Sequence, residues 1–488
     1  MSISKFYEFR EIFITGVTGS LGKVLLEKLL RSCNTRKIYV LIRCKEGMPA
    51  EERKTELFRC KIFENVLLKN PDIYNKVKCI EGNLTRENLG ISFSDMNLIA
   101  KNVSLVFHLA ASVKFNEPFR DAFVNNVEAT KNVIEVCRQM KNLSAFLHTS
   151  TAYSFCNRKE VDEKIYTMSR TYEEFQSIAN PQNNASIDIT DKNISEGRPN
   201  TYTLTKAITE NYLNDFCRDL PIVIVRPSVV GCALKEPFRG WTDNNSGADS
   251  LIASGLKGIF RNMLVDEDKV CDFIPSDAVI NLMLAATWRK AITSHRSENE
   301  IPVYNCTSGS INPFTWGQFF GCLKTHYWNY PSENTFLYPT KIPKKNYYWN
   351  RVCIVVQHQF PALLFDISQI AVGRKPKMMN VYKKVHRTIN MLEYFCVWDW
   401  KFGARNVQEL LETMSTQDKQ NFDFDISKLN WYQYMEDYVL GIRRFVLNED
   451  DSTIPRGRKT LLVKYYLILF ANTGLFFGFL YSLTFLSF

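Results

Sequence analysis

The sequence predicts an α/β fold with a doubly wound parallel sheet, followed by a mainly helical domain and a C-terminal transmembrane helix. Three observations support this prediction. Short apolar runs alternate with helical patterns from the N-terminus onward. A glycine-rich turn joins the first apolar run to the first helical pattern, as in a Rossmann-type domain. The last 24 residues carry no charged side chain, and this length spans a bilayer as one helix.

The first predicted strand and helix flank the glycine turn. Residues 12–14 form a short apolar run that suits a buried strand, and leucines and valines recur at helical spacing after the turn. The turn has a GxxGxxG pattern, which lets the backbone approach a pyrophosphate while a helix N-terminus offers free N–H groups. A glycine-containing loop in another α/β fold is the alternative. The predicted cofactor contacts here are Thr15, Gly16, Gly19, Ser20, Leu21 and Gly22.

The end of the second predicted strand indicates which nicotinamide cofactor binds. This strand, KIYVLI, is followed by Arg43 and, two positions later, by Lys45. NAD-binding domains usually have an acidic residue here for the ribose 2′-hydroxyl, whereas cations can pair with a 2′-phosphate. The sequence therefore favours NADPH over NADH. A solvated strand end is the alternative interpretation of the two cations.

Two further strands are predicted to end beside the dinucleotide. The segment VKCIEGNL ends at Asn83 and Leu84, and the segment SLVFHLAAS ends at Ala110 and Ala111. Small side chains at a strand end let a dinucleotide lie close to the backbone, although alanines there can also pack against a helix. We predict that all four residues contact the cofactor. His108, on the second of these strands, is expected to be a packed core histidine.

The next strand and the helix after it carry the predicted catalytic residues. The strand AFLHTS ends at Ser150 and Thr151, and after an insert of about fifty residues a helix carries Tyr202 and Lys206. The YxxxK spacing puts both side chains on one helix face. A nearby ammonium is expected to lower the pKa of the phenol from its ordinary value near 10. Tyr202 could then protonate a carbonyl oxygen as hydride arrives.

The roles of the neighbouring residues follow from this chemistry. Lys206 is expected to hold the nicotinamide ribose as well, and a hydroxyl at the strand end would contact the same carbonyl oxygen as Tyr202. Thr151 is preferred over Ser150 for that contact, and both remain candidates. The following strand, PIVIVRPSVVG, is expected to face the nicotinamide carboxamide with its backbone at Pro227 and Val229.

Composition narrows the class of partner. The 488 residues carry a net charge of +10, but no Lys/Arg run with interleaved aromatics indicates a nucleic-acid site. An anionic metabolite or an anionic membrane surface explains the charge as well. The thirteen cysteines are scattered singly, without CxxC spacing, so we predict neither a metal site nor disulfides, and a cytosolic location of the thiols.

The C-terminus is predicted to be a membrane anchor. The uncharged segment from Tyr465 to Phe488 follows a cluster of cations at Arg456, Arg458, Lys459 and Lys464. Such cations keep the preceding domain on the cytosolic side. A re-entrant hairpin and an apolar helix docked on the protein are the alternatives. No signal peptide is expected, because no apolar run precedes the first strand.

Longer motifs make the interpretation more specific. The segments HTSTAY, YTLTK, IVRPSVVG, KEPFRGWTDN and VCDFIPSDAVIN, together with LFDISQIAVGRKPKMM and LEYFCVWDWKFGARN farther on, resemble the alcohol-forming fatty acyl-CoA reductases of the extended short-chain dehydrogenase/reductase superfamily. The resemblance covers nearly the whole chain. Three positions differ from the family pattern: Ser20 replaces Phe, Asn83 replaces Asp and Ala129 replaces Gly. The implied domains are an NADPH-binding reductase domain at 1–350, a helical domain at 351–455 and an anchor at 465–488.

The resemblance implies an NADPH-dependent reduction of long-chain fatty acyl-CoA to a primary alcohol, through a hemithioacetal and an aldehyde, with release of CoA. With the predicted anchor, a single-pass protein of the endoplasmic reticulum is the first expectation and the peroxisome the second. A membrane-associated dehydrogenase that acts on a sterol or another lipid carbonyl is the alternative enzyme. A non-catalytic NADP-binding regulator is the alternative outside enzymes. Acyl chain length and oligomeric state stay open.

Overall fold

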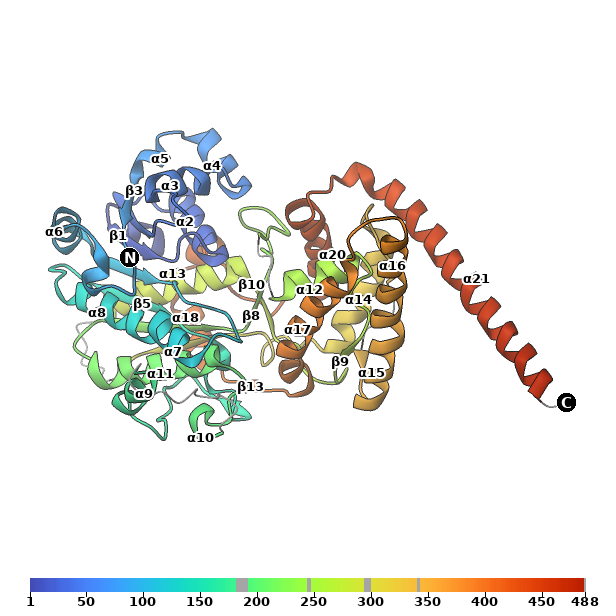
Figure 1. The fold of residues 1–488 in the computed structure, drawn as a ribbon. Helices are drawn as coiled ribbons and strands as arrows, with labels where there is room; N and C mark the ends of the chain where they lie inside the picture. Colours follow the sequence, from blue (N-terminus) through green and yellow to red (C-terminus); the bar gives the residue numbers. More distant parts are fainter. Residues whose placement is uncertain (181–191, 244–246, 294–299, 340–342, 487–488) are drawn as a thin grey trace. The chain divides into compact units, whose positions relative to one another are not determined.

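The computed structural model describes residues 1–180, 192–243, 247–293, 300–339 and 343–486, with side chains beyond residue 467 described only in part (Figure 1). The chain forms two compact units. Unit 1 comprises residues 1–238, 272–313 and 400–429, and unit 2 comprises residues 239–271, 314–399 and 430–488. The units interleave along the sequence, so they differ from the contiguous ranges 1–350 and 351–455 that the sequence predicts. Each unit is described by itself below.

Unit 1 contains a seven-stranded sheet in which every pair of neighbouring strands is parallel. The strand order is β11-β7-β5-β4-β1-β2-β3. The strands are β1 (Glu11–Thr15), β2 (Lys37–Ile42), β3 (Val77–Glu81), β4 (Leu105–His108), β5 (Ala145–Thr149), β7 (Ile222–Pro227) and β11 (Val303–Cys306). This order confirms the predicted doubly wound sheet. From β1 the chain adds strands outward on one side, and from β4 it adds them outward on the other side, so the switch point where such folds bind their ligands lies between β1 and β4. The sequence interpretation did not assign β11, which pairs at the edge beside β7.

Apolar side chains explain why helices cover both faces of this sheet. On one face, strand residues such as Phe13, Val106 and Phe146 pack against buried side chains of three helices, namely α6, α8 and α11. On the other face, α13 contacts β5, β7 and α2. The helices of unit 1 are α1 (Ile3–Tyr7), α2 (Ser20–Ser32), α3 (Ala50–Phe58), α4 (Glu64–Lys69), α5 (Ile73–Lys76), α6 (Phe93–Asn102), α7 (Phe119–Phe123), α8 (Ala129–Arg138), α9 (Tyr172–Ala179), α10 (Lys192–Ser195), α11 (Thr201–Phe216), α13 (Ser276–Thr293), α18 (Arg405–Thr413) and α19 (Thr416–Asn421).

Two small parallel sheets extend the carboxyl edge of the main sheet in unit 1. One pairs β8 (Val229–Gly231) with β10 (Phe273–Pro275), and the other pairs β6 (Glu160–Val161) with β13 (Lys401–Phe402). The second pairing brings a segment from the C-terminal part of the sequence into unit 1. For this reason the compact units cannot be cut from the chain as contiguous pieces.

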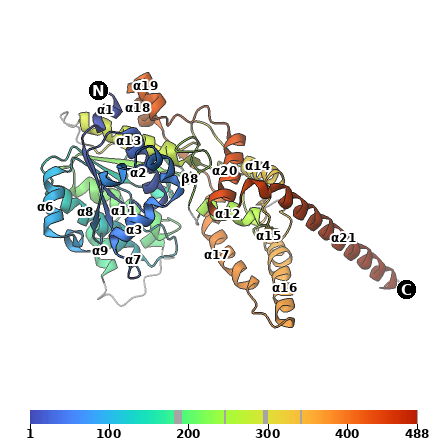
Figure 2. The same ribbon diagram turned by 90° about the horizontal axis from the view of Figure 1, so that it is seen from above.

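Unit 2 is mainly helical, as predicted (Figure 2). Its helices are α12 (Gly247–Leu256), α14 (Trp316–Asn329), α15 (Tyr347–Ile354), α16 (Phe360–Ala371), α17 (Met378–Val397), α20 (Trp431–Gly441) and α21 (Ile454–Leu486), with one short strand pair, β9 (Met263–Leu264) and β12 (Pro343–Lys344). The Asp366 carboxylate accepts hydrogen bonds from the backbone N–H groups of residues 377–379 at 2.9 Å each. It thereby caps the start of α17 and fixes the turn between α16 and α17.

Residues 465–486 of the predicted transmembrane helix lie in α21, the last two residues lie outside the described chain, and most side chains of the segment are not described. Over the part of the chain that the structure describes, no helix combines the length and the apolar composition needed to cross a bilayer. The structure therefore does not confirm the transmembrane part of the predicted fold. The beginning of α21 is anchored in unit 2, where the Arg458 guanidinium donates to the carbonyl of Asn329 at 2.8 Å.

Candidate active site

The glycine turn joins β1 to α2, and the structure requires glycine at some of its three glycine positions but not at all of them. Gly16 has a φ of +81°, and a Cβ there would lie 2.5 Å from the backbone nitrogen of Ala110. A Cβ on Gly22 would lie 2.2 Å from the carbonyl oxygen of Gly16. The fold itself therefore requires glycine at both positions. At Gly19 a Cβ would come no closer than 3.4 Å to Gly16, so the protein alone does not require glycine there.

The open side of this turn fits an anion. Gly19 is exposed and is the N-cap of the 13-residue helix α2, and as a glycine it has no side chain that could cap the first N–H groups of the helix. The first N–H groups of a helix have no partner within the helix, and the helix dipole favours negative charge beside them. Because Gly19 leaves this space unfilled, the turn has room for a pyrophosphate. Among the other predicted contacts of the turn, Ser20 and Leu21 lie in the first turn of α2 and are partly exposed.

Other predicted cofactor residues lie along the same edge, and some of their polar groups are already used within the protein. The Thr15 hydroxyl is buried and lies 2.7 Å from His108 Nδ1. The Asn83 side chain accepts a hydrogen bond from the backbone of Thr85 at 3.2 Å, and the Leu84 carbonyl accepts one from Asn132 at 2.8 Å. Thr15 and Asn83 therefore shape the edge with their side chains.

Ala110 and Ala111 follow β4 and are partly exposed beside the glycine turn. The predicted core role of His108 is confirmed. Its second ring nitrogen lies 3.0 Å from the Thr130 hydroxyl, and burial lowers its pKa to about 3. A histidine that stays neutral and fully hydrogen-bonded at physiological pH supports packing rather than proton transfer.

The cations expected to select the cofactor lie in the exposed loop after β2. Arg43 and Lys45 are both exposed, and the Lys45 ammonium lies 3.3 Å from the Glu46 carboxylate. The Arg53 guanidinium, from α3, donates to the carbonyl of Arg43 at 2.5 Å. The structure thus brings a third cation to this loop. The sequence interpretation missed Arg53 because it lies ten residues after Arg43, in a helix with many charges.

Tyr202 and Thr151 come together from α11 and from the end of β5. Asn200 caps α11 by accepting a hydrogen bond from Thr203 N at 2.9 Å, which fixes Tyr202 in the first turn. Burial raises the pKa of the Tyr202 phenol to about 12, and a hydrogen bond with Thr151 opposes this rise. The phenol ring stacks on Phe115, with ring centroids 5.9 Å apart. Thr151 also donates to the carbonyl of Pro227 at 3.4 Å.

Lys206 lies one helical turn after Tyr202 and is buried. Its ammonium donates to the carbonyl of Thr149 at 2.6 Å. Burial lowers the pKa of Lys206 to about 8, and the Glu210 carboxylate opposes this. The sequence predicts a lowered pKa for Tyr202, and this prediction is wrong, because burial raises the pKa. The interaction that opposes the rise comes from Thr151 and not from Lys206.

Ser150 is directed to a different partner from Thr151. Its hydroxyl donates to Glu210 at 2.5 Å, and the Ser154 hydroxyl donates to the same oxygen at 3.1 Å. Glu210 forms a fully buried ion pair with Arg226. Of the two candidate hydroxyls, the structure thus brings Thr151 to Tyr202 and holds Ser150 in a buried network.

Asn126 is a positioning residue that the sequence interpretation missed. It lies in the π-helical turn η3 (Val124–Glu128), and its amide oxygen accepts from Ser112 N at 2.7 Å. Its amide nitrogen donates to Thr205 at 3.0 Å, which ties the segment after β4 to the helix of Tyr202. π-Helical turns often occur at functional sites. Its place on the same helix face as Ala129 and Val133, three and seven residues later, is the signal that could have identified it.

The strand β7 completes this edge. Pro227 is its last residue, and Val229 begins β8 and is partly exposed. The predicted strand-end residues therefore lie at the carboxyl ends of β1, β2, β3, β4, β5 and β7, which is one edge of the parallel sheet, and α11 adds Tyr202 and Lys206. In the described part of the chain, no group of three or more His, Cys, Asp or Glu side chains could hold a metal ion. The arrangement offers a pyrophosphate cradle and two adjacent hydroxyls for a carbonyl oxygen.

Comparison with solved structures supports the same fold. The terminal R domain of the myxalamid PKS-NRPS pathway has a TM-score of 0.58 at 17% identity, covering 90% of this chain and 91% of that domain. The reductase domain of a nonribosomal peptide synthetase from Mycobacterium tuberculosis has a TM-score of 0.60 at 14% identity, covering 90% and 92% of the two chains.

Sequence comparison identifies the family. Two family models, both described as male sterility protein, match residues 14–283 and 357–449. Fatty acyl-CoA reductase 1 of Xenopus laevis is 41% identical over 94% of this chain and 89% of that protein, and its Homo sapiens counterpart is 40% identical over the same shares. Fatty acyl-CoA reductase 2 of Homo sapiens is 36% identical over 97% of this chain and 92% of that protein. The chain therefore belongs to the fatty acyl-CoA reductase family.

Proposed function

We propose that this protein reduces a long-chain fatty acyl-CoA to a primary fatty alcohol, with two NADPH consumed and CoA released. The observation that carries the proposal is the meeting of Thr151 and Tyr202 at the sheet edge that also holds the open glycine turn at Gly19. Membership of the fatty acyl-CoA reductase family indicates the substrate class.

Two hydroxyls and one ammonium do the work of the chain in this reaction. When bound, NADPH supplies the hydride for both reductions, that of the thioester to a hemithioacetal, which releases CoA as its thiol, and that of the resulting aldehyde to the alcohol. Thr151 and Tyr202 donate hydrogen bonds to the substrate oxygen, and Tyr202 transfers its proton as negative charge develops there. Each reduction places an oxygen at the same position, so one site serves both.

Lys206 positions and supports this proton transfer. With a pKa of about 8, it is mostly charged at neutral pH. Its hydrogen bond to the Thr149 carbonyl fixes the ammonium beside the end of β5. From there it is available to a ribose hydroxyl of the cofactor, which it orients for the reduction that Tyr202 completes.

The preference for NADPH rests on the cations of the loop after β2. Arg43 and Lys45 are exposed, and Arg53 contacts the Arg43 carbonyl. A 2′-phosphate placed here would be paired by guanidinium groups, whereas an NADH ribose would offer them no charge. The Arg43→Asp variant should lower the ratio of kcat/KM for NADPH over that for NADH by at least tenfold. Lys69→Asp, an exposed control outside this loop, should leave the ratio unchanged. An unchanged ratio in Arg43→Asp would place the phosphate elsewhere.

We also propose a membrane location. The uncharged segment 465–488, with Arg456, Arg458, Lys459 and Lys464 before it, supports a single-pass anchor that leaves the catalytic residues in the cytosol. The endoplasmic reticulum is the first choice of membrane, with the peroxisome second. An anchor suits this reaction, since long acyl-CoAs and fatty alcohols partition into bilayers.

The proposed function is tested by following thiol and NADPH together. The purified chain, supplied with hexadecanoyl-CoA and NADPH, should release free thiol and consume two NADPH for each thiol. A steroid ketone offered under the same conditions should cause no NADPH consumption. Consumption with the steroid but not with the thioester would support the alternative dehydrogenase, and binding of NADPH without consumption on either substrate would support a regulator.

A further inference from the structure

A continuous stretch of unit 2 exposes an unusual number of large apolar side chains. It comprises α15, the π-helical turn η5 (Val355–Gln359) and α16, and only Ala362 and Asp366 are buried within α16. Soluble proteins rarely expose apolar patches of such extent unless the patch contacts a partner or a membrane. The exposed members of this apolar face are Tyr347, Tyr348, Trp349, Val352, Val355, Val356, Phe360, Leu363, Leu364, Phe365, Ile367, Ile370 and Val372.

Positive charge surrounds this apolar face. Residues 347–390 carry seven Lys and Arg residues and one acidic residue, Asp366, so this segment has a net charge of +6 of the chain's +10. Asp366 is buried as the cap of α17, so the exposed charged side chains of this segment are all cations. The cations are Arg351, Arg374, Lys375, Lys377, Lys383, Lys384 and Arg387, all of them exposed.

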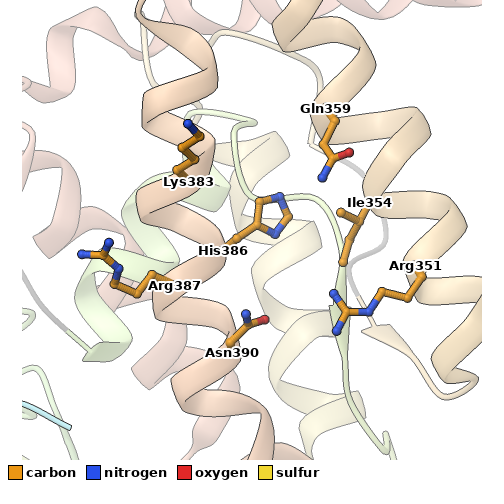
Figure 3. A pocket seen from close by; sticks show the side chains of 7 residues that line it. All are labelled: Arg351, Ile354, Gln359, Lys383, His386, Arg387 and Asn390. Carbon is orange, nitrogen blue, oxygen red and sulfur yellow. The ribbon is translucent and has the colours of Figure 1, made fainter. Parts of the chain in front are cut away.

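A cavity of about 530 Å³ lies between these helices (Figure 3). Its lining residues on α15 and η5 are Arg351, Ile354 and Gln359, and those on the facing helix α17 are Lys383, His386, Arg387 and Asn390. Arg351 also lowers the pKa of His386, after burial, which is the larger cause. A cavity with three cations and no acidic lining residue suits a phosphate group.

The apolar face and the C-terminal apolar segment pack on the same part of unit 2. Phe336 packs edge-on against Phe365 of α16, with ring centroids 5.5 Å apart. Two residues later, Tyr338 packs against Tyr465, with centroids 5.1 Å apart. Tyr465 is the first residue of the uncharged segment, and Lys464 donates to the carbonyl of Thr335. The two apolar segments thus start from neighbouring points of one packed segment.

We propose that the apolar face of α15, η5 and α16 inserts into the interface of an anionic bilayer, with lipid phosphates bound by the surrounding cations and by the cavity between α15 and α17. Exposed tyrosine and tryptophan at 347–349 suit the headgroup level, and aliphatic side chains of α16 suit the acyl boundary. A second copy of the chain is a poorer occupant, because two segments with a net charge of +6 would repel each other. This contact is separate from the proposed C-terminal anchor.

Trp349 provides a native probe, because it is 59% exposed within the face. The full chain is reconstituted with vesicles of phosphatidylcholine and phosphatidylserine whose acyl chains are brominated, since bromine quenches tryptophan only at close contact. Quenching should be strong in the wild type, and Trp349→Phe should remove most of it. Trp398→Phe, which alters another exposed tryptophan outside the face, should leave it in place. If Trp349→Phe quenches like the wild type, the proposal is wrong.

The charge requirement is tested with the same readout. The variant Lys375→Glu, Lys377→Glu, Lys384→Glu should need a larger phosphatidylserine fraction for half-maximal quenching of Trp349. The matched control Lys69→Glu, Lys101→Glu, Lys141→Glu, made at exposed lysines of unit 1, should behave like the wild type. Equal curves for all three proteins would overturn the charge argument. Two results would overturn the bilayer as the occupant. In the first, the quenching of Trp349 changes with added CoA but not with the lipid composition. In the second, sedimentation without vesicles shows a dimer in which Trp349 is no longer exposed.

NADPH binding and thermal unfolding serve as controls of folding. The variants change exposed side chains of unit 2, whereas the glycine turn lies in unit 1, so both measurements should match the wild type. A variant that fails either control is replaced by Leu364→Ser with Ile367→Ser, which reduces the apolar face without altering its charge.

Discussion

The environment of Lys206 sets an expected pH dependence at the residue scale. Burial lowers its pKa from the ordinary 10.5 to about 8, so the ammonium is charged below pH 8 and loses its proton as the pH rises through 8. If catalysis needs this charge, kcat/KM should be close to its maximum near pH 7. We expect kcat/KM for the acyl-CoA to fall about tenfold for each pH unit above 8.

The same proton changes folding stability with pH in the opposite direction to activity, so the two effects can be measured separately. Between pH 8 and about 10.5 the unfolded chain keeps the Lys206 proton and the folded chain does not, so the contribution of Lys206 to stability rises with pH. Deprotonation of Lys206 should therefore lower activity without lowering the melting temperature. Activity that stays constant to pH 9.5 would exclude a charged Lys206 from the mechanism.

Single residues also mark what the sequence could predict about the site. The YxxxK spacing predicted that Tyr202 and Lys206 share a helix face, because helical geometry fixes positions four residues apart. Neighbouring residues at a strand end point to opposite sides, so only one of Ser150 and Thr151 was expected to face Tyr202. The sequence favoured Thr151, and the structure pairs Thr151 with Tyr202. The pKa of Tyr202 was predicted in the wrong direction, since burial depends on the whole surrounding structure.

At the scale of elements, the glycine turn offers a matched pair of substitutions. In Gly22→Ala the new Cβ meets the Gly16 carbonyl oxygen at 2.2 Å, so the helix must move away from the turn. We expect a loss of about 2 kcal/mol or more in the free energy of unfolding. In Gly19→Ala the nearest contact is 3.4 Å, so stability should change little while the dissociation constant for NADPH rises.

Thermal unfolding and fluorescence titration with NADPH measure the two effects separately. The account predicts that Gly22→Ala melts at a lower temperature and that Gly19→Ala melts with the wild type but binds NADPH at least tenfold more weakly. Wild-type binding by Gly19→Ala would mean that the pyrophosphate does not lie at this turn.

The predictability of elements followed their local signals. Strands β1, β2, β3, β4, β5 and β7 were predicted because each is an apolar run beside a turn or a helical pattern. The run of β11 is interrupted by Asn305, so this strand could not be assigned without its pairing to β7. The ion pair of Glu210 with Arg226 was not predicted either, because the two residues lie on different elements and only the fold brings them together.

At the scale of the whole molecule, the compact units do not follow the order of the sequence. The pairing of β13 with β6 places residues 400–429 in unit 1, although residues of unit 2 come both before and after them in the sequence. A contiguous division was predicted because the motifs that resemble the two domains of the family follow one another along the chain, and their order does not reveal such a return. Long motifs nevertheless identified the family, since they extend over both units.

The proposed C-terminal anchor belongs to this scale, and the contacts of α21 decide where to truncate. Lys464 and Tyr465 pack on residues 335–338, so the cut should follow Tyr466 rather than precede Lys464. The truncated chain should keep its fold and should no longer float with vesicles of pure phosphatidylcholine. It should still associate with vesicles rich in phosphatidylserine through the face of α16. Flotation with the neutral vesicles would show that the C-terminal segment is not the anchor.

The central claim is that Tyr202 protonates the oxygen of an acyl-CoA that bound NADPH reduces twice. It is tested most directly with NADPH deuterated at the transferred position and hexadecanoyl-CoA, followed by mass spectrometry of the lipid product. Tyr212→Phe is the control, because Tyr212 is a core tyrosine of the same helix. The account predicts hexadecanol with two deuterium atoms at C1 from the wild type and the control, and a product at least a hundredfold less abundant from Tyr202→Phe. Equal amounts of this alcohol from Tyr202→Phe, or no alcohol from the wild type, would contradict it.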